Sequence, residues 1–279
     1  MRRVTLILFA ALLAGCRGDR IEEPLTTTER QAETATPSSE VEPPSLSAPA
    51  KGLRVDFASF AGTATGYLSV PSTAGPHPGV IVVQEWWGVD GWVKEQTDRL
   101  AGLGYVALAV DLYRGRVARD PDLAHQLMRG LPEDQALADL RGGIDYLSAR
   151  PDVDASRVGV IGWCMGGGYA LKLATVEPRL KAAVVNYGSL ITDPASIARI
   201  QAPLLGHFGG RDQGIPPAVV RAFESSAKRA GKTVDLKIYD TAGHAFMNPD
   251  NQAGYDANAA TDAWNRTTEF LEQTLRPSS

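Results

Sequence analysis

The segment 162–166 (GWCMG) places a thiol, Cys164, between two glycines directly after the apolar run 158–161. Its spacing is that of the nucleophile elbow Gly-x-Ser-x-Gly, in which the nucleophile stands on a tight turn between a strand and a helix. Sterics explain why glycine stands at both flanking positions, because side chains there would clash in such a turn. The pattern predicts acyl transfer through a thioester on Cys164, whereas a free cysteine elsewhere is usually a small buried apolar residue.

A thiol nucleophile needs a general base, which follows the nucleophile and the acid in the chain order of α/β-hydrolases. The histidines are His77, His125, His207 and His244. The first two precede the elbow and are excluded by this order, and His207 lies in the apolar run 203–208, where an interior histidine packs. His244 follows the strand-like segment 234–239 and the loop 240–243. We therefore expect His244 to be the base, and the alternative is an ordinary surface histidine.

The acid of such a site should stand on a loop between the nucleophile and the base. Asp212 fits, because the strand-like run 204–208 leads into 209–212 (GGRD) and then toward a helix. Its carboxylate would accept the proton-bearing nitrogen of His244, fix the tautomer and stabilise the imidazolium. Asp240 is the alternative acid but lies very near His244 in sequence, and Asp212 could also be an ordinary turn aspartate.

Several separated segments, in this order, resemble the dienelactone hydrolase family from about residue 53 to the C-terminus. They are 80–89 (VIVVQEWWGV), 104–107 (GYVA), 111–113 (DLY), the Cys164 elbow, 209–212 (GGRD) and 242–246 (AGHAF). The resemblance implies an α/β-hydrolase fold and a catalytic triad of Cys164, His244 and Asp212.

The resemblance also implies roles for residues that flank the nucleophile. Glu85 would hold the resting thiol until substrate displaces it, which protects a reactive thiolate from oxidation between turnovers. By the same analogy, the backbone N–H groups of Met165 and Trp86 would form the oxyanion hole.

Two positions depart from the family pattern. Members that act on dienelactone are understood to hold its free carboxylate with two arginines. Asn248 stands where one arginine is expected, and Gly115 stands in the other position, flanked by Arg114 and Arg116. We therefore expect the same mechanism on a different ester or lactone that lacks this anionic group.

Aromatic and polar residues near the same segments are candidates for a substrate pocket. The expected pocket residues are Trp87, Tyr113, Arg114, Phe246 and Asn248. Trp86, Trp163, Tyr187 and Met247 could add apolar wall or belong to the core. For Arg114 the alternative is a solvated loop arginine.

The N-terminus has the pattern of an export signal. Residues 1–15 combine a basic start with a short apolar stretch and small residues, and 13–16 (LAGC) resembles the lipobox of bacterial lipoproteins. Cys16 would then be lipidated, and the alternative is a plain secretory signal. Residues 16–52, rich in Glu, Thr, Pro and Ser, are expected to form a disordered tether. We expect a lipid-anchored, periplasm-facing protein of the bacterial cell envelope, and Arg17 favours the outer membrane.

Composition limits the classes of partner. The chain has 279 residues, a formal net charge of −4 and two cysteines, and residues 53–279 are the size of one large domain. Because the chain has no basic stripe, we do not expect nucleic acid as a partner. With Cys16 lipidated, Cys164 would have no disulfide partner, and a lone thiol in an oxidising compartment is best explained as a nucleophile. We expect a monomer without metal or organic cofactor, since the other histidines and acids lack ligand spacing.

Apolar runs and helical periodicity alternate along residues 53–279, which predicts an α/β domain with a doubly wound, mostly parallel sheet and helices on both faces. Strands are expected at 53–57, 63–70, 79–84, 105–111, 157–162, 181–187, 203–208 and 234–239. Helices are expected at 92–103, 134–149, 165–177, 217–231 and 255–275. Glu85, Cys164, Asp212 and His244 would all follow carboxyl ends of strands, the edge at which open α/β sheets bind ligands.

The leading hypothesis is a hydrolase of carboxylic esters or lactones that works through a thioester on Cys164. Two alternatives remain open. The same site could pass the acyl group to an alcohol or amine as an acyltransferase, or the chain could be a non-catalytic binding lipoprotein on a hydrolase scaffold.

Overall fold

The computed structural model describes residues 51–276, so the predictions for residues 1–50, including the signal peptide and the lipidation of Cys16, lie outside the described residues. One eight-stranded sheet has the order β1-β2-β4-β3-β5-β6-β7-β8. The strands are β1 (Leu53–Ser59), β2 (Gly62–Ser69), β3 (His77–Val83), β4 (Val106–Asp111), β5 (Val153–Trp163), β6 (Leu180–Asn186), β7 (Leu204–Gly209) and β8 (Val234–Tyr239). β2 pairs antiparallel with β1 and with β4, and the six strands β3 to β8 run parallel to one another.

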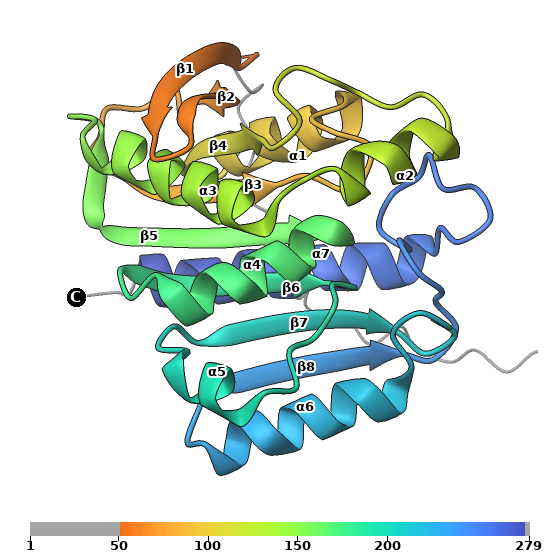
Figure 1. The fold of residues 1–279 in the computed structure, drawn as a ribbon. Helices are drawn as coiled ribbons and strands as arrows, with labels where there is room; N and C mark the ends of the chain where they lie inside the picture. The colour runs from red at the N-terminus through yellow and green to blue at the C-terminus, as the bar shows by residue number, and fades with distance from the viewer. Residues whose placement is uncertain (1–50, 277–279) are drawn as a thin grey trace, which may run out of the picture. The chain divides into compact units, whose positions relative to one another are not determined.

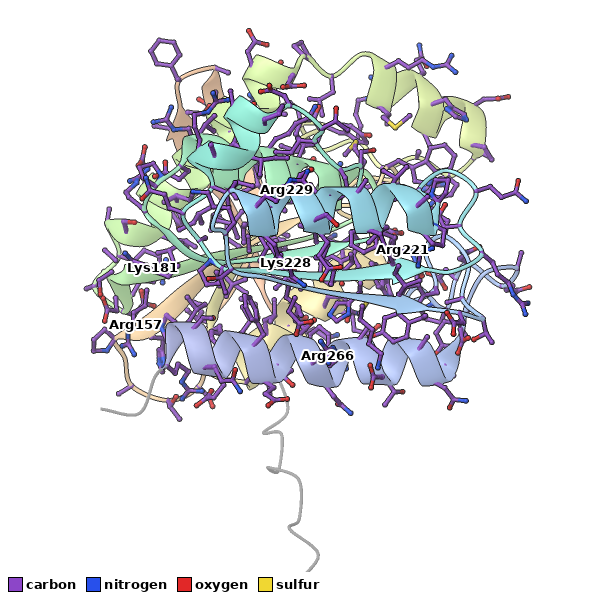
Figure 2. The ribbon with its side chains drawn as sticks, turned by 90° about the horizontal axis from the view of Figure 1, so that it is seen from below. Arg157, Lys181, Arg221, Lys228, Arg229 and Arg266 are labelled. Atoms are coloured by element: carbon purple, nitrogen blue, oxygen red, sulfur yellow. The ribbon has the colours of Figure 1, made fainter. Side chains whose placement is uncertain are left out.

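The helices cover both faces of this sheet (Figure 1). They are α1 (Gly91–Gly102), α2 (Pro121–Arg129), α3 (Glu133–Ser148), α4 (Met165–Val176), α5 (Pro194–Arg199), α6 (Pro217–Arg229) and α7 (Ala257–Leu275). α1 and α7 bury their apolar residues in one core, and the helices from α3 to α6 bury theirs in a second core on the opposite face. Seen from below, the sheet lies between α6 and α7 (Figure 2). The predicted fold class, a doubly wound α/β-hydrolase fold, is confirmed.

The central strands are buried along their whole length because helices cover both of their faces. In β4, all six residues of the sequence VALAVD are buried, and β3 is buried from its second residue onward. Continuous β-branched and small apolar runs of this kind are typical of parallel strands in the middle of an α/β sheet. None of the helices within residues 51–276 is long and apolar enough to cross a bilayer.

The face seen from below carries several basic side chains, among them those labelled in Figure 2. Three of them have acidic partners: Arg157 pairs with Asp154 at 2.7 Å, Lys228 with Glu224 at 2.5 Å and Arg266 with Asp235 at 2.6 Å. The side chains of these pairs are partly accessible to solvent, so each pair contributes little to stability.

Two helices, α2 and α5, were not expected from the sequence. Both begin with Asp-Pro, and in both the aspartate caps the helix: Asp120 accepts from the N–H of Leu123 at 2.9 Å, and Asp193 from that of Ser196 at 2.8 Å. An N-cap aspartate followed by proline at the first helical position is a recognised start signal. It could have identified both segments, although neither carries a long apolar stripe.

The parallel strands bring the four expected catalytic residues to one edge of the sheet. β3 and β5 are neighbours in the sheet, as are β7 and β8, and all four run in the same direction. Glu85, Cys164, Asp212 and His244 each follow the carboxyl end of one of these strands. The topology therefore gathers them at the edge where ligands bind in such sheets.

Candidate active site

Cys164 occupies a strained turn between β5 and α4. Its backbone has φ 53° and ψ −118°, a conformation that residues with a side chain rarely adopt. A Cβ on Gly162 would overlap the carbonyl of Gly166, and a Cβ on Gly166 would overlap the carbonyl of Val83. Only glycines at these positions let the turn pack so tightly against β3, and the turn lifts the thiol clear of the sheet.

Three side chains from separate loops form a continuous line of contacts. Nε2 of His244 lies 3.1 Å from Sγ of Cys164, and Nδ1 of His244 lies 2.7 Å from Oδ2 of Asp212. The other carboxylate oxygen of Asp212 accepts from the backbone N–H groups of Gly214 and Ile215 at 2.8 and 3.0 Å. These two bonds fix the carboxylate, so that Oδ2 is available to orient the imidazole.

Electrostatics favour a protonated imidazole in this arrangement. Burial lowers the pKa of His244, but the hydrogen bonds and charges of Asp212 and Cys164 raise it more, to about 10. Burial likewise raises the pKa of Asp212, and the bonds from His244, Ile215 and Gly214 outweigh that effect and lower it below its ordinary value. At neutral pH the pair is a charge-assisted hydrogen bond, which holds the ring in one orientation.

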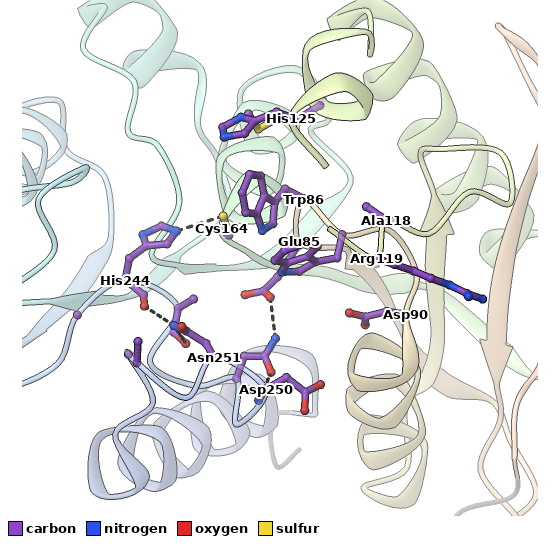
Figure 3. Close-up of a pocket in the computed structure, with 17 residues that line it drawn as sticks. Glu85, Trp86, Asp90, Ala118, Arg119, His125, Cys164, His244, Asp250 and Asn251 are labelled. Carbon is purple, nitrogen blue, oxygen red and sulfur yellow. Dashed lines mark hydrogen bonds between the residues drawn. The ribbon is translucent and has the colours of Figure 1, made fainter. Parts of the chain in front are cut away.

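Glu85 is buried below the thiol and is bonded to an amide. Asn248 donates from Nδ2 to Oε2 of Glu85 at 2.9 Å (Figure 3), while Oε1 has no hydrogen-bond partner among the described residues. Burial raises the pKa of Glu85 to about 7, because a charged carboxylate is poorly solvated there. Within residues 51–276 no hydrogen bond joins Glu85 to Cys164, whose thiol faces His244 instead.

The loop that carries His244 is held by a residue that the sequence analysis did not single out. Ala245, directly after the histidine, has φ 55°. Asn251 donates from Nδ2 to the carbonyl oxygens of His244 and Ala245 at 3.0 and 3.3 Å. Side-chain amides commonly stabilise turns in this way, but the contact depends on a fold-back of the chain that no local pattern announces.

A cavity of about 910 Å³ opens above these residues (Figure 3). It is bordered by Cys164, His244 and Glu85, and of the expected pocket residues by Trp87 and Asn248. The remaining lining residues are Trp86, Asp90, Ala118, Arg119, His125, Met128, Gly243, Ala245, Asp250, Asn251, Ala253 and Gly254.

Three expected pocket residues, Tyr113, Arg114 and Phe246, do not border this cavity. Phe246 is fully buried and packs against Tyr187 and Tyr239, with ring centroids 5.4 and 5.0 Å apart, because the turn at Ala245 directs it into the core.

The other two, Tyr113 and Arg114, contact residues outside the cavity lining. The guanidinium of Arg114 pairs with the buried carboxylate of Asp139 at 2.8 Å and also donates to the carbonyl of Thr63. Tyr113 is buried, and its hydroxyl contacts Sδ of Met165 at 3.2 Å. Tyr113 therefore packs beside the elbow, and Arg114 joins β2 to α3.

The two expected oxyanion donors, Met165 and Trp86, both lie in segments next to the thiol. Met165 is the first residue of α4, where the N–H has no acceptor within the helix. Trp86 follows the end of β3 and borders the same cavity as Cys164. Their role in binding an oxyanion stays a prediction.

Two further histidines have clear surroundings. His207 is fully buried, as expected for a packed side chain, and contacts the hydroxyls of Tyr239 and Thr267 at 3.1 and 3.2 Å. Burial lowers its pKa to about 3. His125, which the chain order excludes as the base, nevertheless borders the cavity, because the unexpected helix α2 carries it there.

Comparison with known proteins shows the family of this chain. Residues 64–275 match the Dienelactone hydrolase family. A protein of Methylorubrum extorquens that carries the name of a carboxymethylenebutenolidase is 34% identical over 226 residues, 76% of this chain and 77% of that protein. The protein Usf of Aquifex pyrophilus is 32% identical over 80% of this chain and 99% of its own length.

Solved structures show the same fold. A dienelactone hydrolase-like promiscuous phosphotriesterase from metagenomic libraries superposes with a TM-score of 0.74 at 27% identity, over 80% of this chain and 98% of that one. An acylaminoacyl peptidase of Pyrococcus horikoshii, at 19% identity and a TM-score of 0.65, covers 82% of this chain and 42% of its own, and shows only that the fold is shared. The chain belongs to the dienelactone hydrolase family and is a hydrolase with the α/β-hydrolase fold.

Proposed function

We propose that this hydrolase cleaves carboxylic esters or lactones through a thioester on Cys164. The observation that carries the proposal is the line Asp212–His244–Cys164, with contacts of 2.7 and 3.1 Å, at the floor of a large cavity. The names of relatives support the substrate class, since one of them carries the name of a 2-oxo-3-(5-oxofuran-2-ylidene)propanoate lactonase.

In the first half-reaction, Sγ of Cys164 attacks the ester carbonyl and forms a carbon–sulfur bond. The carbonyl electron pair moves to oxygen, where the N–H groups of Met165 and Trp86 would stabilise the negative charge. As the oxyanion collapses, the carbon–oxygen bond to the leaving group breaks, and Nε2 of His244 donates its proton to the departing alkoxide. Asp212 holds the ring in place through Nδ1.

In the second half-reaction, His244 accepts a proton from water as the water oxygen attacks the thioester carbonyl. The oxyanion forms and collapses again, and this time the carbon–sulfur bond breaks. The product is the carboxylic acid, and the thiolate of Cys164 is restored beside a protonated His244. No other reactant is required.

We further propose that Glu85 alternates between two partners. In this structure its carboxyl is bonded to Asn248 and the thiol faces His244. A rotation of Cys164 toward Glu85 would give the protected resting state that the family resemblance implies, with a protonated thiol bonded to the carboxyl. Asn248 would receive the carboxyl when substrate binding returns the thiol to His244.

The cavity favours a substrate without a second carboxylate. Asn248 contributes a neutral amide, Gly115 has no side chain, and Arg114 is held by Asp139. Asp90 and Asp250 border the cavity and would repel an anion, whereas Arg119 is the arginine among the lining residues. We therefore propose a neutral ester or lactone, with its apolar part against Trp86, Trp87 and Met128.

The test is turnover of p-nitrophenyl acetate by residues 50–279, with nitrophenol release and intact protein mass followed together. Wild-type protein should turn over and gain transiently one acetyl group, and Cys164→Ala should do neither. Comparison with the anionic p-nitrophenyl hemisuccinate should favour the neutral ester. An acetyl adduct on Cys164→Ala, or equal release by both proteins, would contradict the proposed nucleophile. Added methanol separates hydrolysis from acyl transfer, since only a transferase would give methyl acetate as the main product.

We also propose that the mature protein is lipid-anchored through Cys16 and faces the periplasm. The support is the sequence 13–16 (LAGC) after a basic and apolar start, followed by a segment poor in large apolar residues. In bacterial cells the full chain should fractionate with membranes, and Cys16→Ser should release it. Retention of Cys16→Ser in the membrane fraction would contradict a lipid anchor at this residue.

A further inference from the structure

We propose that His125 is a positioning residue for the oxyanion hole: its ring holds the indole of Trp86 and thereby fixes the backbone N–H next to the nucleophile. The inference rests on the proposed function, in which Trp86 donates that N–H. His125 touches no reacting atom in this proposal and acts only through Trp86.

The first observation is the packing of Trp86. Its indole lies between two rings: Trp87, with centroids 4.8 Å apart and planes at 60°, and His125, with centroids 4.8 Å apart and planes at 84°. Figure 3 shows the His125 ring next to the indole, at the margin of the cavity that also contains Cys164. The contact with Trp87 is tilted and that with His125 is edge-to-face. An edge-to-face contact is directional, so the His125 ring restricts rotation of the indole.

The second observation is that the loop 85–90 is held from the α2 side. The N–H of Ala118 donates to the carbonyl of Trp87 at 2.8 Å. Gly88 has φ 103°, and a Cβ there would lie 2.6 Å from the carbonyl oxygen of Arg116. The loop's own turn bond, from the N–H of Gly88 to the carbonyl of Glu85, is long at 3.4 Å. The segment that leads into α2, together with His125, therefore sets the place of Trp86 beyond the end of β3.

The third observation concerns the ring nitrogens. Nδ1 of His125 is buried and has no hydrogen-bond partner among the described residues. A buried nitrogen without a partner is unfavourable, so this nitrogen does not explain the position of the ring. The contact with Trp86 is made by the aromatic ring itself, and phenylalanine can reproduce it.

A mechanistic consequence follows from this geometry. The N–H of Trp86 would bind oxygen more strongly in the transition state than in the ground state, so a displaced N–H should lower kcat and leave KM nearly unchanged. Alkylation of the thiol, which forms no oxyanion on a carbonyl, should not depend on the position of this N–H.

The experiment compares His125→Ala, His125→Phe and Gln126→Ala, an exposed neighbour on α2, in the protein used for p-nitrophenyl acetate turnover. For each variant kcat and KM are measured, together with inhibition by propionaldehyde and the rate of alkylation by chloroacetamide. Sγ of Cys164 adds to the carbonyl carbon of propionaldehyde, and the carbonyl electron pair moves to oxygen while His244 keeps its proton. The resulting hemithioacetal oxyanion is the species that the oxyanion hole would bind. Chloroacetamide reports on the thiol alone.

For His125→Ala we expect kcat to fall tenfold or more, KM to change less than threefold and propionaldehyde inhibition to weaken about tenfold. Its alkylation rate should stay within about twofold of wild type, since a small displacement of a donor is costly only where an oxyanion forms. His125→Phe should retain most of kcat, and Gln126→Ala should resemble wild type. In a Trp86→Ala background, the change at His125 should alter kcat less than twofold, because the two residues act as one unit.

The proposal is overturned if His125→Phe loses as much kcat as His125→Ala, since a ring nitrogen would then be essential. It is also overturned if His125→Ala retains kcat, or if alkylation falls in parallel with kcat, which would indicate collapse of the whole site. If His125→Ala does not fold, two measurements decide instead. They are the kcat of His125→Phe, and the comparison of kcat with and without that same change at His125 in the Trp86→Ala background. Failure of the proposed function is distinguishable, because Cys164→Ala would then turn over like wild type.

Discussion

The side-chain amide of Asn248 donates to Oε2 of Glu85 over 2.9 Å, although the two residues are 163 positions apart. A neutral amide thus faces a buried carboxyl group at the position where the family pattern expects an arginine. An amide stabilises the charged form less than a cation would, and burial is the dominant effect on this carboxyl. The pair connects the floor of the cavity to the loop that carries His244.

Glu85→Gln is expected to remove a pH-dependent loss of stability. The pKa of Glu85 is about 7 in the folded state and 4.5 as its ordinary value, so the folded protein binds more protons than the unfolded chain between these pH values. Stability therefore falls as pH rises from 4.5 to 7, by about 3 kcal/mol at most from this group. Urea unfolding at pH 5 and pH 8 should show a smaller decrease for Glu85→Gln. Equal decreases in both proteins would contradict this, and the exposed Glu95→Gln is the control.

Asp212→Asn should lower activity and the pKa of His244 together. Burial lowers the pKa of His244, but Asp212 and Cys164 together raise it to about 10, so wild-type His244 keeps its proton up to that pH and loses it above. Without the carboxylate, the proton should be lost at a lower pH, and kcat/KM should fall by about 10²- to 10⁴-fold. An NMR titration of the imidazole and a pH–rate profile measure both effects. Asp240→Asn, at the alternative acid, should leave both unchanged, and the reverse result would assign the acid to Asp240.

Gly166→Ala should prevent the elbow from closing. The new Cβ would overlap the backbone carbonyl oxygens of Val83 and Gln84, and backbone atoms cannot move aside as a flexible side chain can. We expect a loss of about 3 kcal/mol or more in the free energy of unfolding, at the upper end for overpacked sites. Gly91→Ala, where a Cβ would meet nothing within 4 Å in the first turn of α1, is the matched control. It should be neutral or stabilise by up to about 1 kcal/mol. A stable, active Gly166→Ala would refute the steric account.

Asn251→Ala should loosen the His244 loop. The two bonds from Nδ2 of Asn251 hold the carbonyls of His244 and Ala245, so their loss should cost about 1–2 kcal/mol and reduce kcat about tenfold. Thermal unfolding and p-nitrophenyl acetate turnover test this. The exposed Gln252→Ala should have neither effect, and a wild-type kcat for Asn251→Ala would show that the loop keeps its position without these bonds.

The central part of the site could be predicted from the sequence because its signals are local. The spacing of glycines around Cys164 describes a turn of five residues, and the loops of Asp212 and His244 each follow a short apolar strand. Parallel strands then deliver their carboxyl ends to one edge, whatever the details of packing. The structure places His244 within hydrogen-bond distance of both Cys164 and Asp212.

The pocket wall could not be predicted in the same way. Phe246 lies two residues after His244, yet the positive φ of Ala245 directs it into the core. Arg114 follows a strand end, yet Asp139 on α3 holds it by an ion pair. His125 precedes the elbow and lies on a short helix, yet α2 brings it against Trp86. Each outcome depends on a partner from another element, which residue type and neighbouring sequence do not specify.

The sequence by itself determined the parallel α/β architecture, the strained turn at Cys164 and the chain order of nucleophile, acid and base, because periodicity, turn sterics and motif spacing act over a few residues. Only the tertiary structure decided that Glu85 is bonded to Asn248, that Asn251 holds the His244 loop, and which aromatic rings face the cavity. Those contacts join segments brought together by the pairing of the strands and the packing of the helices on the sheet. Their geometry depends on distances between elements, and no local pattern contains that information.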